Sequence, residues 1–194
     1  MALPLSSQLV NLLAALLLLL AFAMLAQRRV LTLIKLYAWQ GAALALSTLI
    51  VAHVTGHWHL VFSAALTLLL KVMLIPWILH RLIDKLSVRW DVETLINIPA
   101  TMLAGIGLAI FAFALATPIS QMASTITRST LGIALASVLL SFLMMIVRRK
   151  AVPQVIGFLS MENGVFFAAT SATYGMPLVV ELGIALDVLV GTFI

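Results

Sequence analysis

The sequence predicts an all-α integral membrane protein with about seven transmembrane helices. Hydrophobic residues make up 64% of its 194 residues and charged residues only 9%, whereas a soluble domain carries about 25% charged residues. The mean hydropathy is +1.23, and the apolar runs are long enough to cross the roughly 30 Å hydrocarbon core of a bilayer. We therefore take lipid to be the solvent of the chain and expect a single membrane domain over residues 1–194.

The apolar runs divide the chain into spans of roughly 20 residues, the length that a membrane helix needs. Arg28 and Arg29 follow the first apolar run, whereas the positive residues of a secretory signal precede its apolar run. We therefore expect this run to be retained as a transmembrane helix. Pro118 and Pro153 stand near span ends, where a missing N–H costs little. The last run is short, and we expect the C-terminus to be truncated. The predicted spans are 4–26, 31–53, 59–80, 98–117, 129–147, 154–174 and 177 onward.

The basic residues predict the orientation of these spans. Nine of the eleven Lys and Arg residues follow the first, third and fifth spans, and such residues collect on the cytoplasmic side of a membrane. We therefore expect the N-terminus outside and the C-terminus in the cytoplasm of a bacterial or archaeal inner membrane. The same placement explains the net charge of +5 without nucleic acid as a partner. The nine residues are Arg28, Arg29, Lys35, Arg81, Lys85, Arg89, Arg148, Arg149 and Lys150.

Four ionisable residues fall away from the ends of the predicted spans: Lys71 in the third, Glu162 in the sixth, and Glu181 and Asp187 in the seventh. Each costs about 2.5–3.5 kcal/mol at the centre of a membrane helix unless it faces protein or water. At about 1.5 Å per residue, Glu162, Asp187 and Lys71 lie about 18–22 Å from the outer end, and Glu181 about 10 Å. This common depth suits a proton relay. The alternative is that the acids pair with cations and only fix the assembly.

The neighbours of these residues add local predictions. Asn163 can hydrogen-bond the surroundings of the Glu162 carboxylate, and Gly164 leaves room either for a water molecule or for a closely packed backbone. Pro76 removes a helical hydrogen bond and frees a carbonyl next to Lys71. That carbonyl either assists ion conduction or reflects a kink needed only for packing.

Two pairs of similar stretches suggest that the chain contains two parallel repeats. The stretch "IKLYAWQGA" aligns with "IGFLSMENG" and sets Gln40 against Glu162. The stretch "LTLLLKVML" aligns with "LGIALDVLV" and sets Lys71 against Asp187. The first three spans are then a degenerate copy of the last three, with an amide in place of one acid and the opposite charge in place of the other.

The stretch "GFLSMENG", followed by "VVELGIALD", resembles the membrane subunit called hydrogenase-4 component E. That family belongs to group 4 nickel–iron hydrogenases and formate hydrogenlyase-type complexes, and its last three helices are similar to the K subunit of respiratory complex I. The K subunit carries one Glu in each of two helices, and Glu162 and Glu181 fall at these positions. The resemblance thus implies N-terminal helices over 1–117 and a three-helix bundle like the K subunit over 129–194, the latter being the functional unit.

The resemblance implies a non-catalytic subunit of an oxidoreductase complex, with no cofactor, no metal and no redox chemistry of its own. Its implied partners are antiporter-like membrane subunits, a membrane protein similar to the H subunit of complex I, and the peripheral hydrogenase arm, in addition to lipid. Its acids would belong to a path for protons or sodium ions. The residues we assign to that path are Glu162, Glu181, Asp187 and Lys71, with Asn163 and Gln40 in support.

Two other functions remain open from the sequence. One is a stand-alone proton-coupled secondary transporter that uses Glu162 as its coupling acid, and the other is a structural adaptor subunit without ion conduction. A third possibility, metal binding by His53, His57 and His59, is disfavoured because no acid or Cys accompanies them in their loop. Trp58 in the same loop indicates an interfacial anchor.

Overall fold

The computed structural model describes residues 5–86, 92–122 and 127–173, and these residues form an all-helical bundle. Five helical stretches are long and apolar enough to cross a membrane, so the multi-pass membrane class is confirmed. The predicted count of seven is not: the sixth run forms α7, and the seventh lies outside the described residues. The elements are α1 (Leu5–Ala26), α2 (Val30–Thr55), α3 (Trp58–Thr67), the π-helix η1 (Leu68–Leu74), α4 (Ile75–Leu86), α5 (Ile98–Met122), α6 (Thr127–Val147) and α7 (Ala151–Thr173).

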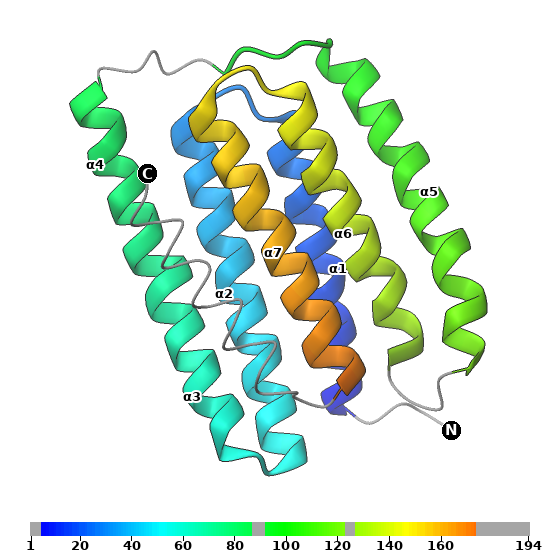
Figure 1. Ribbon diagram of the computed structural model, residues 1–194. Coiled ribbons are helices and arrows are strands. Elements are labelled where there is room, and N and C mark those ends of the chain that lie inside the picture. Colours follow the sequence, from blue (N-terminus) through cyan, green and yellow to red (C-terminus); the bar gives the residue numbers. More distant parts are fainter. Residues whose placement is uncertain (1–4, 87–91, 123–126, 174–194) are drawn as a thin grey trace.

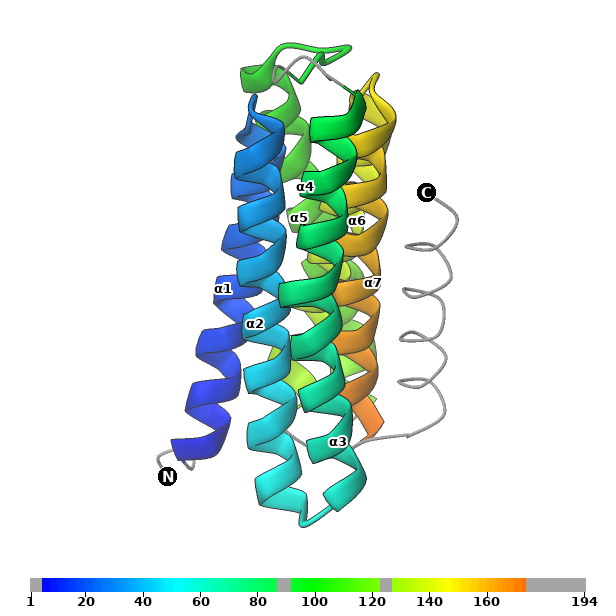
Figure 2. The ribbon, with the colours of Figure 1, turned by 90° about the vertical axis from the view of Figure 1, so that its left-hand side faces the viewer.

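Four helices form the centre of the bundle. α1 packs on α2, α2 on α7, α7 on α6, and α6 on α1, which closes a ring (Figure 1). The nearly continuous rod of α3, η1 and α4 flanks this ring along α2, and α5 flanks it along α6. Figure 2, turned by 90°, shows the rod beside α2 and α7. Residues on α2, η1 and α7 can therefore meet near the middle of the bundle.

Close backbone packing sets the rotation of α7 about its axis. A Cβ added at Gly164 would lie 2.8 Å from Val138 Cγ2 and 3.4 Å from the Ala134 carbonyl oxygen, and one at Gly157 would lie 2.9 Å from Met145 Cγ. Small residues at such contacts let membrane helices approach and gain van der Waals energy. Of the two predicted uses of Gly164, close packing is therefore the one found, with α6 as the neighbour.

The loops that carry the basic residues meet at one end of the bundle. The backbone N–H of Val92 donates to the Arg28 carbonyl at 2.7 Å, and that of Leu95 donates to the Val147 carbonyl at 2.8 Å. Farther along, the Arg149 N–H donates to the Glu93 carbonyl at 3.2 Å. These bonds tie together the loops after α1, α4 and α6, as the basic residues predicted. In Figure 1 they lie at the top.

Arg148 differs from its basic neighbours. It follows the fifth predicted span together with Arg149 and Lys150, but only 1% of its surface is exposed. Its Nη2 donates to the carbonyls of Met24 at 3.1 Å and Leu25 at 2.9 Å, where α1 ends and its last carbonyls lack helical partners. A cation at a helix C-terminus is also favoured by the helix dipole. Burial lowers the pKa of Arg148 to about 10, so the guanidinium stays charged at neutral pH and fastens the α6–α7 loop to α1.

Two prolines lie beyond the first turn of a continuous helical stretch. Pro118 stands at the end of the apolar span Ile98–Pro118, as predicted, and α5 continues past it to Met122. Neighbouring groups let a membrane helix tolerate such a proline. Pro76 lies two residues after η1, so the disturbance predicted for the third span takes the form of a π-helix around Lys71.

Candidate functional site

A buried polar cluster joins three helical elements in the interior of the bundle. Lys71 Nζ on η1 donates to Asn163 Oδ1 on α7 at 2.7 Å. Asn163 Nδ2 donates in turn to Gln40 Oε1 on α2 at 3.2 Å. All three side chains are at most 1% exposed. We call these residues the Lys71–Asn163–Gln40 cluster. It contains Lys71 and both predicted supporting residues, drawn from the first and the last parts of the chain.

The ammonium group fixes the orientation of both amides. An ammonium can only donate, so the atom of Asn163 that faces Lys71 must be its oxygen. The amide nitrogen of Asn163 then faces Gln40, and it requires the oxygen of Gln40. The Nε2 group of Gln40 is thereby turned away from both partners, and it is buried without a hydrogen-bond acceptor. The cluster thus ends on a donor that a water molecule or a bound ion's hydration shell can satisfy.

The backbone around Lys71 is adapted to the cluster. The Ile75 N–H bonds the Leu70 carbonyl, five residues back, as in a π-helix. Opposite Lys71 on α2 stands Gly41, where an added Cβ would lie only 2.9 Å from Lys71 Cβ. The Lys71 ammonium also lies 5.7 Å from the ring centre of Phe166, within the range of a cation–π interaction. π-Helices occur frequently at functional sites, which supports the choice of Lys71.

Glu162 adjoins the cluster but faces another direction. Successive helical residues differ by about 100°, so Glu162 is turned about 100° from Asn163 and about 200° from Gly164, which packs on α6. The Glu162 side chain therefore points away from α6. It is partly buried, and its Oε2 is buried without a hydrogen-bond donor. Because Lys71 bonds Asn163, the next residue after Glu162, Glu162 and Lys71 lie at one level along the bundle, while Glu181 and Asp187 lie outside the described residues.

Sequence reasoning overlooked Ser63 and Thr67. Both lie on the rod that carries Lys71, both are buried, and both hydroxyls lack a hydrogen-bond partner. Their positions could have been noticed, since Ser63, Thr67 and Lys71 follow one another at intervals of four residues and so share a helix face.

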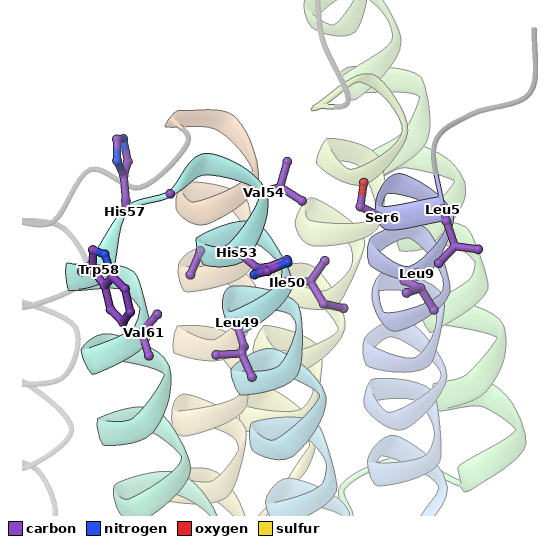
Figure 3. A pocket seen from close by; sticks show the side chains of 12 residues that line it. Leu5, Ser6, Leu9, Leu49, Ile50, His53, Val54, His57, Trp58 and Val61 are labelled. Atoms are coloured by element: carbon purple, nitrogen blue, oxygen red, sulfur yellow. The ribbon is translucent and has the colours of Figure 1, made fainter.

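Three of the four histidines, His53, His57 and His59, stand at the opposite end from the basic loops. The rings of His57 and His59 stack with centroids 5.1 Å apart, and His53 lines a mostly apolar cavity of about 660 Å³ (Figure 3). Among the described residues, no three His, Asp or Glu side chains gather closely enough to hold a metal ion. Trp58 is 83% exposed, which suits the predicted interfacial anchor.

The chain has a relative among known proteins. The chain matches no family model and no solved structure. It is 34% identical over 157 residues to the uncharacterized protein Rv0085 of Mycobacterium tuberculosis. The matched region covers 80% of this chain and 71% of that protein, so it includes most of the bundle. The chain therefore belongs to the same family as Rv0085.

Proposed function

We propose that this protein is a membrane-arm subunit of a redox-driven ion-pumping complex related to group 4 nickel–iron hydrogenases and complex I. In this proposal it performs no redox chemistry and contributes intramembrane charged groups to a path for protons or sodium ions. The observation that carries the proposal is the Lys71–Asn163–Gln40 cluster, buried in the bundle at the depth of the Glu162 carboxylate.

The energetics of the cluster support a functional role. A lysine within the membrane is expensive even when paired, and a hydrophobic side chain at the same place would pack without that cost. A polar network kept only for stability is expected to satisfy its members fully. Here Gln40 Nε2 and Glu162 Oε2 are both buried and unpaired. Such groups suit a site where water molecules or ions enter and leave.

The partners and location follow from the same proposal. Antiporter-like subunits, a chain similar to the H subunit of complex I and the peripheral hydrogenase arm are the proposed partners. The proposed membrane is the cytoplasmic (inner) membrane of a bacterium or archaeon, with the N-terminus outside and the basic loops in the cytoplasm. Purification in a mild detergent tests the assembly: hydrogenase and antiporter-like chains should co-purify. A chain that purifies alone, intact and folded, contradicts the complex.

The ion path is tested by replacing Glu162. Glu162→Gln keeps the shape and hydrogen-bonding capacity of the side chain and removes its titratable proton. In vesicles with equal complex content, this variant should sharply reduce proton uptake driven by the redox reaction, while redox turnover remains measurable. Glu181→Gln should have a milder effect.

Glu93→Gln is the matched control for this experiment. It makes the same chemical change on a loop acid that is 61% exposed and lies 3.4 Å from Lys150 Nζ, an ion pair of the kind that contributes at most about 1 kcal/mol. This control should pump normally. Normal pumping by Glu162→Gln as well would overturn the ion-path proposal.

A further inference from the structure

The rod formed by α3 and η1 carries a polar stripe that ends at Lys71, and its other members, His59, Ser63 and Thr67, have no part in the proposed function. His59, Ser63, Thr67 and Lys71 are spaced by four residues. His59 is exposed at the α2–α3 end of the bundle, whereas Ser63, Thr67 and Lys71 are 7%, 0% and 1% exposed. The stripe therefore leads from the surface, on the side away from the basic loops, to the Lys71–Asn163–Gln40 cluster.

The two hydroxyls in this stripe differ from most of the hydrogen-bonded hydroxyls in the described helices. A Ser or Thr in a membrane helix commonly donates to the carbonyl four residues earlier, as Thr48 does to Leu44 at 3.0 Å and Thr170 does to Phe166 at 3.0 Å. Ser63 Oγ and Thr67 Oγ1 are equally buried but have no hydrogen-bond partner. Buried hydroxyls without a protein partner are the groups that ordered water molecules satisfy.

The spacing fits single water molecules. Four residues of α-helix rise about 6 Å, and two hydrogen bonds of about 2.8 Å placed end to end span that distance. One water molecule can thus bridge each gap. The π-helix helps alignment, because its i→i+5 bonding turns through a smaller angle per residue than an α-helix does. It therefore offsets the sideways drift of the stripe between Thr67 and Lys71.

We propose that a single file of water molecules runs along α3 from His59, past Ser63 and Thr67, to Lys71, and that protons move along it. A hydroxyl can donate and accept at once, so each Ser, Thr or water gives up one O–H proton as it receives another. At the inner end the Lys71 ammonium releases one N–H proton to the nearest water and takes one back as the neutral amine, so no oxidant or reductant is needed. The file gives the cluster access to the side of the membrane opposite the basic loops. Its role in transport rests on the proposed function, but its hydration does not.

Hydration is tested first, with cysteine accessibility. The chain contains no Cys. Each single-Cys variant therefore carries one thiol, and no other thiol of the chain contributes to the labelling. Ser63→Cys and Thr67→Cys are compared with His59→Cys, which is at the surface, and with Ser137→Cys. Ser137 is a fair control because its hydroxyl is also buried and unpaired, yet the residue one turn earlier is the apolar Ile133.

Silver ions are added to sealed proteoliposomes at the α2–α3 end, and the remaining thiols are labelled with a fluorescent maleimide after denaturation. Ser63→Cys and Thr67→Cys should lose their labelling nearly as completely as His59→Cys, and Ser137→Cys should keep it. If Thr67→Cys keeps its labelling as Ser137→Cys does, the water file does not exist.

Proton transport is tested second, by replacing Thr67 alone. Thr67→Val preserves the shape and removes the hydroxyl, so it should lose most redox-driven proton uptake, and Thr67→Ser should restore it. If Thr67→Val shows full redox-driven proton uptake although silver ions reach the introduced thiols, the file contains water but conducts no protons that the pump uses. That result would overturn this proposal and leave the Glu162→Gln result intact. Silver access together with unaffected pumping in Glu162→Gln would instead overturn the proposed function and leave the hydrated file standing.

Discussion

The bond between Lys71 and Asn163 should be one of the stronger polar couplings in this bundle. It can be isolated by a double-mutant cycle with Lys71→Met and Asn163→Leu, made singly and together. The cycle removes each residue's other interactions from the balance and leaves the energy of the pair. Both substitutes are apolar and of similar bulk, so the double variant should recover part of the stability that Asn163→Leu loses by removing the Asn163 oxygen from a buried ammonium.

The size of the coupling follows from the geometry. A hydrogen bond to a charged group contributes about 1.5–3 kcal/mol in soluble proteins, but cycles in a membrane protein average about 0.6 and reach about 1.7 kcal/mol. The Lys71–Asn163 distance of 2.7 Å is at the short end for an ammonium donor, and both residues are buried. We therefore expect a coupling near the upper membrane value, about 1.5 kcal/mol.

The assay is reversible unfolding in mixed micelles by increasing SDS, followed by circular dichroism. A matched neutral pair serves as the reference: Ser141 Oγ and Ser160 Oγ lie 2.7 Å apart and are equally buried, at the α6–α7 contact. The cycle of Ser141→Ala and Ser160→Ala should give about 0.6 kcal/mol. A Lys71–Asn163 coupling no larger than that of the serine pair would refute the charge-assisted bond.

Further predictions concern packing and the α1 terminus. Gly164→Ala should lower the free energy of unfolding by about 1–3 kcal/mol, because the new Cβ would lie 2.8 Å from Val138 Cγ2. Gly107→Ala, where no atom lies within 4 Å of the new Cβ, should be neutral or stabilise by up to about 1 kcal/mol in the same unfolding assay, and equal losses in both variants would contradict the close packing. Arg148→Met should destabilise by about 1–3 kcal/mol because it removes the side-chain donor to the Met24 and Leu25 carbonyls at the end of α1, whereas the same change at the exposed Arg149 should have little effect. Similar melting temperatures for the two arginine variants would show that the bonds to α1 contribute nothing.

The positions of the helices could be predicted from the sequence because bilayer thickness and helical rise are fixed quantities. The predicted span 31–53 corresponds to α2, Val30–Thr55, and the predicted span 154–174 corresponds to α7, Ala151–Thr173. Counting residues from the loops also predicted that Lys71 and Glu162 lie at one level along their helices. The bond between Lys71 and Asn163, the residue next to Glu162, agrees with this prediction. The excess of basic residues in alternate loops correctly predicted that those loops lie at one end of the bundle.

The partner of Lys71 could not be predicted, because it depends on how α7 is rotated. Glu162 and Asn163 are adjacent in sequence and about 100° apart on the helix, and nothing in the local sequence states which one faces Lys71. The glycine contacts with α6 settle that rotation: they turn Asn163 toward α2 and η1, and they turn Glu162 away from α6.

By itself the sequence determined the membrane class, the approximate helix limits, the common end of the basic loops and the shared level of Lys71 and Glu162, since these depend on composition and on distances along one helix. Only the tertiary structure decided that Asn163 binds Lys71, that Arg148 is buried against the end of α1 while Arg149 is exposed, and that Ser63 and Thr67 are enclosed without partners. Each of these depends on which faces of different helices meet. Packing between helices sets those contacts, and the energy of packing is shared among many residues far apart in the sequence.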